Sequence, residues 1–142
     1  MNIGRIASNA VLRYPGAKWR IADFILQHMP RHHSYLEPFF GSGAVFFRKT
    51  PAPIETVNDI NCDVVNLFRI VREQADTLAE YIAGIPYARQ VYEEALYVNE
   101  STSDLERAVR FLVMAWQSYG ARMDGKNCGW KKDVVGREAS YA

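Results

Sequence analysis

The amino-acid sequence predicts an α/β protein in which an incomplete parallel sheet is followed by a helical region. Within residues 1–75, apolar positions at helical spacing alternate with short apolar runs, an order typical of parallel sheets. Within residues 76–142, the apolar positions mostly follow the helical period alone. We therefore expect two units that divide near residue 75. Only two strands are visible, whereas a doubly wound sheet usually has about five or more.

The first unit is predicted to begin with a helix and a buried strand. Apolar residues at helical spacing indicate a helix over 17–29, which Pro30 ends. The apolar run at 35–40 is typical of a buried strand, and it stops at a glycine turn over 41–43. A second helix is expected to start directly after this turn, at 44–47.

A second strand is predicted over 55–60, and Asn61 is suited to cap the helix that follows it. The apolar face of that helix consists of Val64, Leu67, Phe68 and Val71. In the second unit, helices are predicted over 76–83, 87–99 and 104–119. Ser103 and Glu106 form a capping box at the start of the last of these, and Gly120 can end it. Beyond Gly120 the sequence allows either a β-hairpin or a mobile loop.

Composition excludes few classes, but charge is distributed unevenly. The net charge is +1, yet basic residues gather in 1–31 and 107–137 while acidic residues dominate 50–106. This pattern fits either an anionic partner near both ends or an ordinary solvated surface. We see no apolar run of about 18 residues and no signal segment, so no membrane association is expected. Cys62 and Cys128 lack zinc or disulfide spacing, which fits a cytoplasmic protein without metal.

The strongest local signal is the segment Glu-Pro-Phe-Phe-Gly-Ser-Gly at 37–43. Two close glycines after a strand allow the backbone to approach a ligand, and the next helix could offer its amides. The pair alone is weak, because most such pairs are simple turns. Phe46 also occupies the place of the third glycine in the dinucleotide fingerprint.

Asp59 strengthens this prediction because it ends the second predicted strand. An acid at this position of an α/β nucleotide site accepts hydrogen bonds from ribose hydroxyls. The alternative is that Asp59 caps a helix, and the pairing with the glycine turn favours ribose. A further segment, Tyr-Pro-Gly-Ala-Lys at 14–18, offers an aromatic ring and a cation beside a turn, although in isolation it would be an ordinary surface turn.

Taken together, these three segments resemble the DNA adenine methylase family, the Dam-like, D12-class group of N6-adenine methyltransferases found in bacteria and phages, including restriction–modification systems. The resemblance is good over roughly 11–75 and looser to residue 142. It implies a Rossmann-like methyltransferase sheet, S-adenosylmethionine as cofactor and double-stranded DNA as partner. Residues 1–75 would bind the cofactor, and residues 76–142 would begin the target-recognition domain.

The resemblance also assigns roles to individual residues. Tyr14 and Lys18, with Gly16 and Ala17, would pack against the methionine end of the cofactor, and Glu37 would support the glycine loop. Asp59 would bind the ribose hydroxyls and Ile60 would pack on the adenine. The residues of the glycine loop that would cradle the cofactor are Phe39, Phe40, Gly41, Ser42 and Gly43.

The same resemblance predicts contacts with DNA in the basic C-terminal part. Asn127 could reach a base edge, and Trp130 could stack, although a lone tryptophan more often packs. The cations that would pair with phosphates are Arg122, Lys126, Lys131, Lys132 and Arg137.

One departure from the family pattern concerns catalysis. The family's Asp-Pro-Pro-Tyr motif holds a flipped adenine, and these 142 residues contain no Pro-Pro pair. We therefore expect an N-terminal portion without catalytic residues, inactive alone, that self-associates or takes a complementing C-terminal chain. Two alternatives remain: a non-catalytic DNA- or partner-binding remnant, and a fragment of a nicotinamide-dependent oxidoreductase, which the missing third glycine disfavours.

Overall fold

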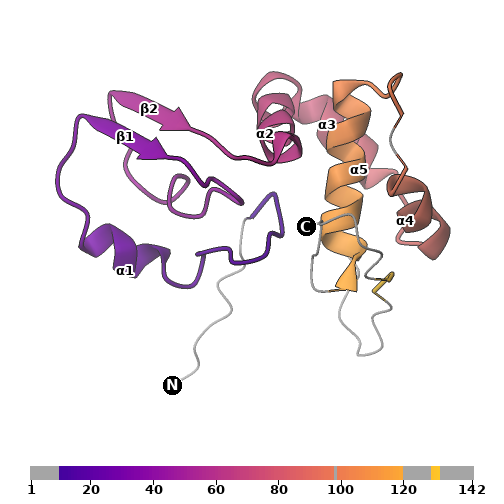
Figure 1. The fold of residues 1–142 in the computed structure, drawn as a ribbon, viewed down its shortest axis with the longest axis horizontal. Helices are drawn as coiled ribbons and strands as arrows, with labels where there is room; N and C mark the ends of the chain where they lie inside the picture. The colour runs from indigo at the N-terminus through magenta and orange to yellow at the C-terminus, as the bar shows by residue number, and fades with distance from the viewer. Residues whose placement is uncertain (1–9, 98, 120–128, 132–142) are drawn as a thin grey trace.

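The computed structural model describes residues 10–97, 99–119 and 129–131. A small sheet with one helix lies on one side of the molecule and four helices lie on the other (Figure 1). The elements in chain order are α1 (Ala22–Gln27), β1 (Ser34–Glu37), β2 (Ile54–Val57), α2 (Cys62–Glu73), α3 (Ala75–Ala83), α4 (Arg89–Ala95) and α5 (Asp104–Gln117).

The two strands pair in parallel, which confirms the predicted parallel pairing. Ser34 lies opposite Ile54 and Glu37 lies opposite Val57, so the carboxyl ends of both strands meet at one edge. Both strands are shorter than predicted. The described residues thus form a mixed helix and strand structure with a two-stranded parallel sheet. This is compatible with an incomplete methyltransferase fold, and the Rossmann-like arrangement stays a prediction.

The expectation of a buried first strand is wrong. Leu36 of β1 is 62% exposed, and all four residues of β2 are exposed. An apolar run predicts burial only if another element covers it. Within the described residues, α1 and the loops cover only part of this sheet, as Figure 1 shows. Tyr35 and Glu37 are half-buried, and they lie on the opposite face of β1 from Leu36.

Two helix predictions in the same part need correction. The helix predicted over 17–29 is limited to α1, because residues 19–21 form turns. The helix start predicted at 44–47 is wrong, since residues 44–48 form turns without a continuous helical ladder. The amide of Phe47 donates to the Gly43 carbonyl and that of Lys49 to Val45, but a short segment closed by Pro51 extends no further.

The main core lies between α2, α3 and α5. Its buried residues include Leu67 and Leu112, which lie on the apolar faces predicted for α2 and α5, and also Ile70 and Phe111, which were not assigned to those faces. Both predicted caps are present: Asn61 accepts a hydrogen bond from the amide of Asp63, and the capping box at the start of α5 is complete. The predicted helix over 87–99 is shorter, because α4 ends at Ala95.

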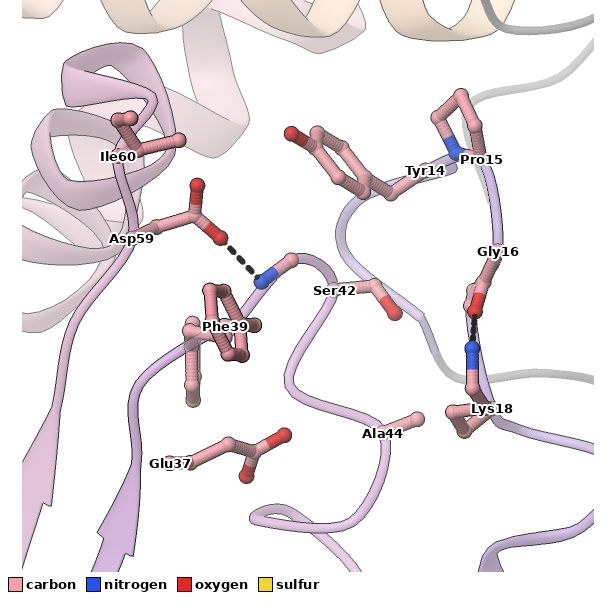
Figure 2. A pocket seen from close by; sticks show the side chains of 13 residues that line it. Tyr14, Pro15, Gly16, Lys18, Glu37, Phe39, Ser42, Ala44, Asp59 and Ile60 are labelled. Atoms are coloured by element: carbon pink, nitrogen blue, oxygen red, sulfur yellow. Dashed lines mark hydrogen bonds between the residues drawn. The ribbon is translucent and has the colours of Figure 1, made fainter.

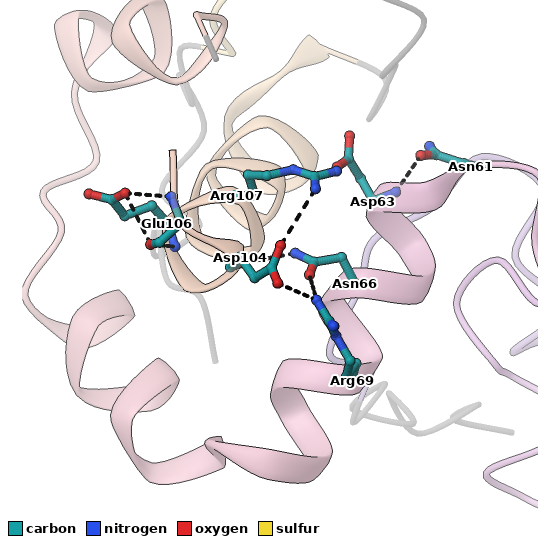
Figure 3. Close-up of polar contacts among 8 residues, drawn as sticks. Asn61, Asp63, Asn66, Arg69, Asp104, Glu106 and Arg107 are labelled. Atoms are coloured by element: carbon teal, nitrogen blue, oxygen red, sulfur yellow. Dashed lines mark hydrogen bonds and ion pairs between the residues drawn. The ribbon is translucent and has the colours of Figure 1, made fainter. Parts of the chain in front are cut away.

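Polar contacts at the N-terminal end of α5 join it to α2 (Figure 3). The Arg107 guanidinium lies 2.6 Å from Asp63, and that of Arg69 lies 2.5 Å from Asp104. The Asn66 amide also donates to the Asp104 carbonyl at 2.8 Å. These contacts join residues on both sides of the predicted boundary at residue 75. The division of the chain at this residue stays a prediction.

The segment after α5 returns to pair with its end. Ser118 and Trp130 form an isolated antiparallel bridge, and the Lys131 amide donates to the Gln117 carbonyl at 2.7 Å. Trp130 lies partly buried against Tyr87 and donates to the Gln117 side chain, so it packs here. This pairing favours the hairpin prediction at the ends of the segment, and residues 120–128 lie outside the described ranges.

Two further properties concern the described residues alone. None of their helices is both long and apolar enough to cross a membrane. None of their His, Cys, Asp and Glu side chains gather into a group that could hold a metal ion.

Candidate functional site

The loops that follow the two strands enclose one cavity together with the turn at 14–18 (Figure 2). Its volume is about 430 Å³, within the range of roughly 300–1,000 Å³ that small-molecule sites usually have. It forms because parallel strands bring their carboxyl-terminal loops to the same sheet edge, where ligands of α/β proteins bind. The lining residues are Tyr14, Pro15, Gly16, Ala17, Lys18, Glu37, Phe39, Phe40, Gly41, Ser42, Ala44, Asp59 and Ile60.

Nearly all of the predicted cofactor residues therefore lie around one cavity. Only Gly43, among the residues assigned to the cofactor from sequence, does not line it. Pro15 and Ala44 also line the cavity, although the sequence analysis did not select them. The sequence indicated these two residues only through their position, because each is adjacent in the chain to a selected residue.

Asp59 connects the two strand ends. Its carboxylate accepts a hydrogen bond from the Gly41 amide at 2.8 Å and one from the Asn61 amide at 2.9 Å. Asp59 thus supports both the glycine turn and the start of α2. The second of these contacts is close to the helix-capping role that the alternative assigned to Asp59. A carboxylate has about four acceptor positions, so these bonds leave two for a ligand in the cavity.

The two glycines of the turn have different reasons to be glycine. Both have positive φ, 51° for Gly41 and 66° for Gly43. A Cβ on Gly41 would lie 3.1 Å from the Tyr14 ring, at the cavity wall. A Cβ on Gly43 would lie 2.6 Å from both Phe40 and Phe47, although Gly43 itself does not line the cavity. Gly41 therefore allows the loop to approach Tyr14, while Gly43 allows aromatic packing behind the loop.

The amides of both glycines of this turn are already used within the protein. The Gly41 amide donates to Asp59, and the Gly43 amide donates to the Phe40 carbonyl at 2.8 Å. The expectation that a helix start offers its amides to a ligand fails here, because the helix itself is absent. The charged side chains that line the cavity are those of Asp59, Glu37 and Lys18.

Glu37 is the second carboxylate of the cavity and is half-buried. The Tyr35 hydroxyl donates to its Oε2 at 2.8 Å. Burial raises the pKa of the Glu37 carboxyl, while the hydrogen bonds from Tyr35 and the Phe46 amide and the charge of Lys49 oppose that shift. The contact with the Phe46 amide links Glu37 to the turns that follow the glycine loop, and the role of Glu37 in supporting that loop stays a prediction.

Lys49 lies behind this carboxylate and was not identified from sequence. Its side chain is 2% exposed, pairs with Glu55 and lies 4.4 Å from the centroid of the Tyr35 ring. A single lysine two residues before a proline belongs to no recognisable motif. Its burial depends on Tyr35 and Glu55, which lie on different strands. Sequence reasoning therefore had no signal for it.

Two apolar side chains at the cavity are almost fully exposed. Phe39 is 85% exposed and Ile60 is 92% exposed, one after each strand. They lie on the same side of the cavity as Asp59 (Figure 2). Exposed apolar groups beside a carboxylate provide a surface on which a flat aromatic group could pack.

Of the residues predicted to contact DNA, only Lys131 lies in the described ranges. It lines a second cavity of about 320 Å³, together with Arg13 and Trp116. Tyr14 and Ala17 line both cavities, so the second adjoins the first. The other predicted residues lie outside the described ranges: Arg122, Lys126, Asn127, Lys132 and Arg137.

Comparison with known protein families identifies a family for this chain. A family model described as D12 class N6 adenine-specific DNA methyltransferase matches residues 14–122, about three quarters of the chain. The chain belongs to this family. The matched range begins at Tyr14 and contains every residue that lines the first cavity.

Individual members of the family are related at moderate identity. A DNA adenine methylase of Escherichia coli (strain K12) is 29% identical over 117 residues, 79% of this chain. One of Haemophilus influenzae is 33% identical over 110 residues, 72% of this chain. A type II methyltransferase of Lactococcus lactis subsp. cremoris is 27% identical over 128 residues. The matches span 42%, 38% and 44% of these relatives, so the chain covers about two fifths of their length.

Proposed function

We propose that the first cavity binds S-adenosylmethionine, and that the chain is the cofactor-binding portion of a site-specific DNA adenine-N6 methyltransferase. The observation that carries this proposal is the single cavity lined by three segments that are far apart in sequence. The family of the chain consists of DNA adenine methyltransferases, which generally use this cofactor.

The polar and apolar groups of the cavity fit the parts of this cofactor. Asp59 keeps two acceptor positions for the ribose hydroxyls, as derived above. The exposed side chains of Phe39 and Ile60 beside it would pack on the adenine ring. Lys18 in the turn at 14–18 and Glu37 at the end of β1 offer opposite charges to the carboxylate and the ammonium of the amino-acid end.

The proposed partner is double-stranded DNA, with methyl transfer to adenine N6 as the reaction. The sulfonium of the cofactor supplies an activated methyl group, and the protein has to hold it in line with the base. The second cavity, with Arg13 and Lys131 beside Tyr14, would place cations for phosphates next to the cofactor. Because the 142 residues contain no Asp-Pro-Pro-Tyr sequence, we propose that this chain alone transfers no methyl group.

Calorimetric titration of S-adenosylmethionine into the 142-residue chain tests the binding. We expect saturable binding by the wild type and its loss in Asp59→Ala. Asn61→Ala is the matched control, because it removes the side-chain cap of α2 but keeps the backbone amide that donates to Asp59. If Asp59→Ala binds as the wild type does, the ribose assignment is wrong. If the wild type does not bind, the remnant hypothesis replaces the proposal.

Transfer of a labelled methyl group to DNA of mixed sequence tests the second half of the proposal. The purified chain with labelled cofactor should leave the DNA unlabelled. Label at adenine N6 would show that the chain needs no Asp-Pro-Pro-Tyr sequence, and the proposal that it is only a cofactor-binding portion would be abandoned.

A further inference from the structure

A layer of polar side chains lies directly behind the cavity and includes none of the residues assigned to the cofactor except Glu37. Tyr35 and Glu37 are two residues apart on β1, so their side chains lie on the same face of the strand. The Tyr35 hydroxyl donates to Glu37 Oε2 at 2.8 Å. Tyr35 itself does not line the cavity, so it can act on a ligand only through Glu37.

The Tyr35 ring is itself fixed from two sides. Lys49 lies 4.4 Å from the ring centroid and pairs with Glu55. The register of the sheet places Glu55 opposite Tyr35, so the lysine bridges the ring and the neighbouring strand. A buried lysine is costly unless a carboxylate and an aromatic face compensate for its lost hydration, and both are present here. The arrangement therefore fixes where the Tyr35 hydroxyl lies.

We propose that Tyr35, held by Lys49 and Glu55, is a positioning residue that keeps the Glu37 carboxylate charged and directed at the amino-acid end of the cofactor. This inference rests on the proposed function. Without the hydroxyl, Glu37 would keep the Phe46 amide as a donor but would lose the partner that fixes its Oε2. The hydroxyl remains a donor at all ordinary pH values, because burial and the bond to Glu37 raise the pKa of Tyr35.

The binding affinities for two ligands distinguish this positioning role from a general structural role. S-adenosylhomocysteine carries the amino-acid end, and 5′-methylthioadenosine carries only the nucleoside with a methylthio group. Tyr35→Phe keeps the ring over Lys49 and removes only the hydroxyl. We expect this variant to bind S-adenosylhomocysteine roughly tenfold more weakly, the effect of losing one hydrogen bond to a charged group. Its affinity for 5′-methylthioadenosine should stay within about twofold of the wild type.

A double-mutant cycle with Glu37→Gln sharpens the assignment. If Tyr35 acts through Glu37, Tyr35→Phe in the Glu37→Gln background should cause no further loss of affinity for S-adenosylhomocysteine. Additive losses, equal weakening of both ligands or no weakening of either in Tyr35→Phe would overturn the inference. Failure of the wild type to bind either ligand would instead reject the proposed function, so the two failures are distinguishable.

The pH dependence gives a readout that a structural role would not change. Protonation of Glu37 should weaken S-adenosylhomocysteine binding on acidification, and Tyr35→Phe should move this loss to higher pH because a bond that lowers the Glu37 pKa is gone. The charged groups around Glu37 are Lys49 behind it, Glu55 on β2, and Lys18 and Asp59 across the cavity. 5′-Methylthioadenosine, which lacks the amino-acid end, serves as the reference ligand at each pH. An unshifted profile in Tyr35→Phe would contradict the inference.

Discussion

The helical part and the sheet part of this chain bury their apolar residues to very different extents. In α2, α3 and α5, the apolar faces lie inside a common core, and Phe111 is 2% exposed. In β1, β2 and the loops after them, Leu36, Phe39 and Ile60 lie largely exposed. The same contrast holds for charge, since the arginines joining α2 and α5 are partly exposed while Lys49 behind the sheet is buried.

The contrast indicates that stability and ligand binding are carried by different parts of the molecule. A closed apolar core resists opening, whereas loops at the edge of a sparsely covered sheet can approach a ligand. The exposed apolar residues of the sheet are also a surface that another chain or further strands could cover. Self-association or a complementing chain thus stays a prediction for the sheet part alone.

The largest expected effect is on the helical core. Phe111→Ala should lower the free energy of unfolding by about 3–5 kcal/mol, because it empties the centre of the packing between α2 and α5. Urea denaturation followed by circular dichroism measures this loss. As the contrasting change, Leu36→Ala in the exposed strand should cost less than about 1 kcal/mol. Equal losses in the two variants would remove the distinction between the parts.

A second prediction concerns the glycine loop. Gly43→Ala should destabilise the protein by about 2–3 kcal/mol, because φ is 66° and the new methyl group would collide with Phe40 and Phe47. Gly16→Ala is a matched control with a φ of 74° and nothing closer than the flexible Lys18 side chain at 3.7 Å. Its loss should be about 1 kcal/mol, from backbone strain alone. If the control loses as much as Gly43→Ala, aromatic packing is not what requires Gly43.

A smaller effect is expected for the ion pairs between α2 and α5. A double-mutant cycle of Arg107→Ala and Asp63→Ala should give a coupling energy of about 0.5–1 kcal/mol, because both side chains are partly exposed. Denaturation at low and high salt measures it, and salt should reduce it. A coupling that salt leaves unchanged would show that the contact is not mainly ionic.

The smallest expected effect is the pH dependence of the capping box. The hydrogen bonds from the Ser103 amide and hydroxyl lower the pKa of Glu106 below its ordinary value of 4.5. Its contribution to stability is therefore present above that value and lost as the pH falls through the lowered one. The stability difference between the wild type and Glu106→Gln should shrink from pH 7 to pH 3. In a Ser103→Ala background the difference should still shrink on acidification but by less, because the backbone amide of residue 103 remains as a donor, and an unchanged pH dependence would show that the hydroxyl contributes nothing.

Much of the site was predictable because chain spacing determines which loops meet at the edge of a parallel sheet. Segments 14–18, 37–43 and Asp59 were selected from sequence, and they line one cavity. The exposure of Leu36 was not predictable, because an apolar run does not reveal whether another element covers it. Lys49 was missed for a related reason, since its burial depends on Tyr35 and Glu55, which only the folded sheet brings to it.

We propose that the cofactor binds in the sheet part while the helical core only supports it. Hydrogen exchange of the 142-residue chain with and without S-adenosylmethionine is the decisive measurement. We predict added protection confined to residues 14–18, 37–44 and 58–60, with no change in α3 and α4. Protection confined to the helices, or no protection at a cofactor concentration that saturates the calorimetric titration, would contradict the claim.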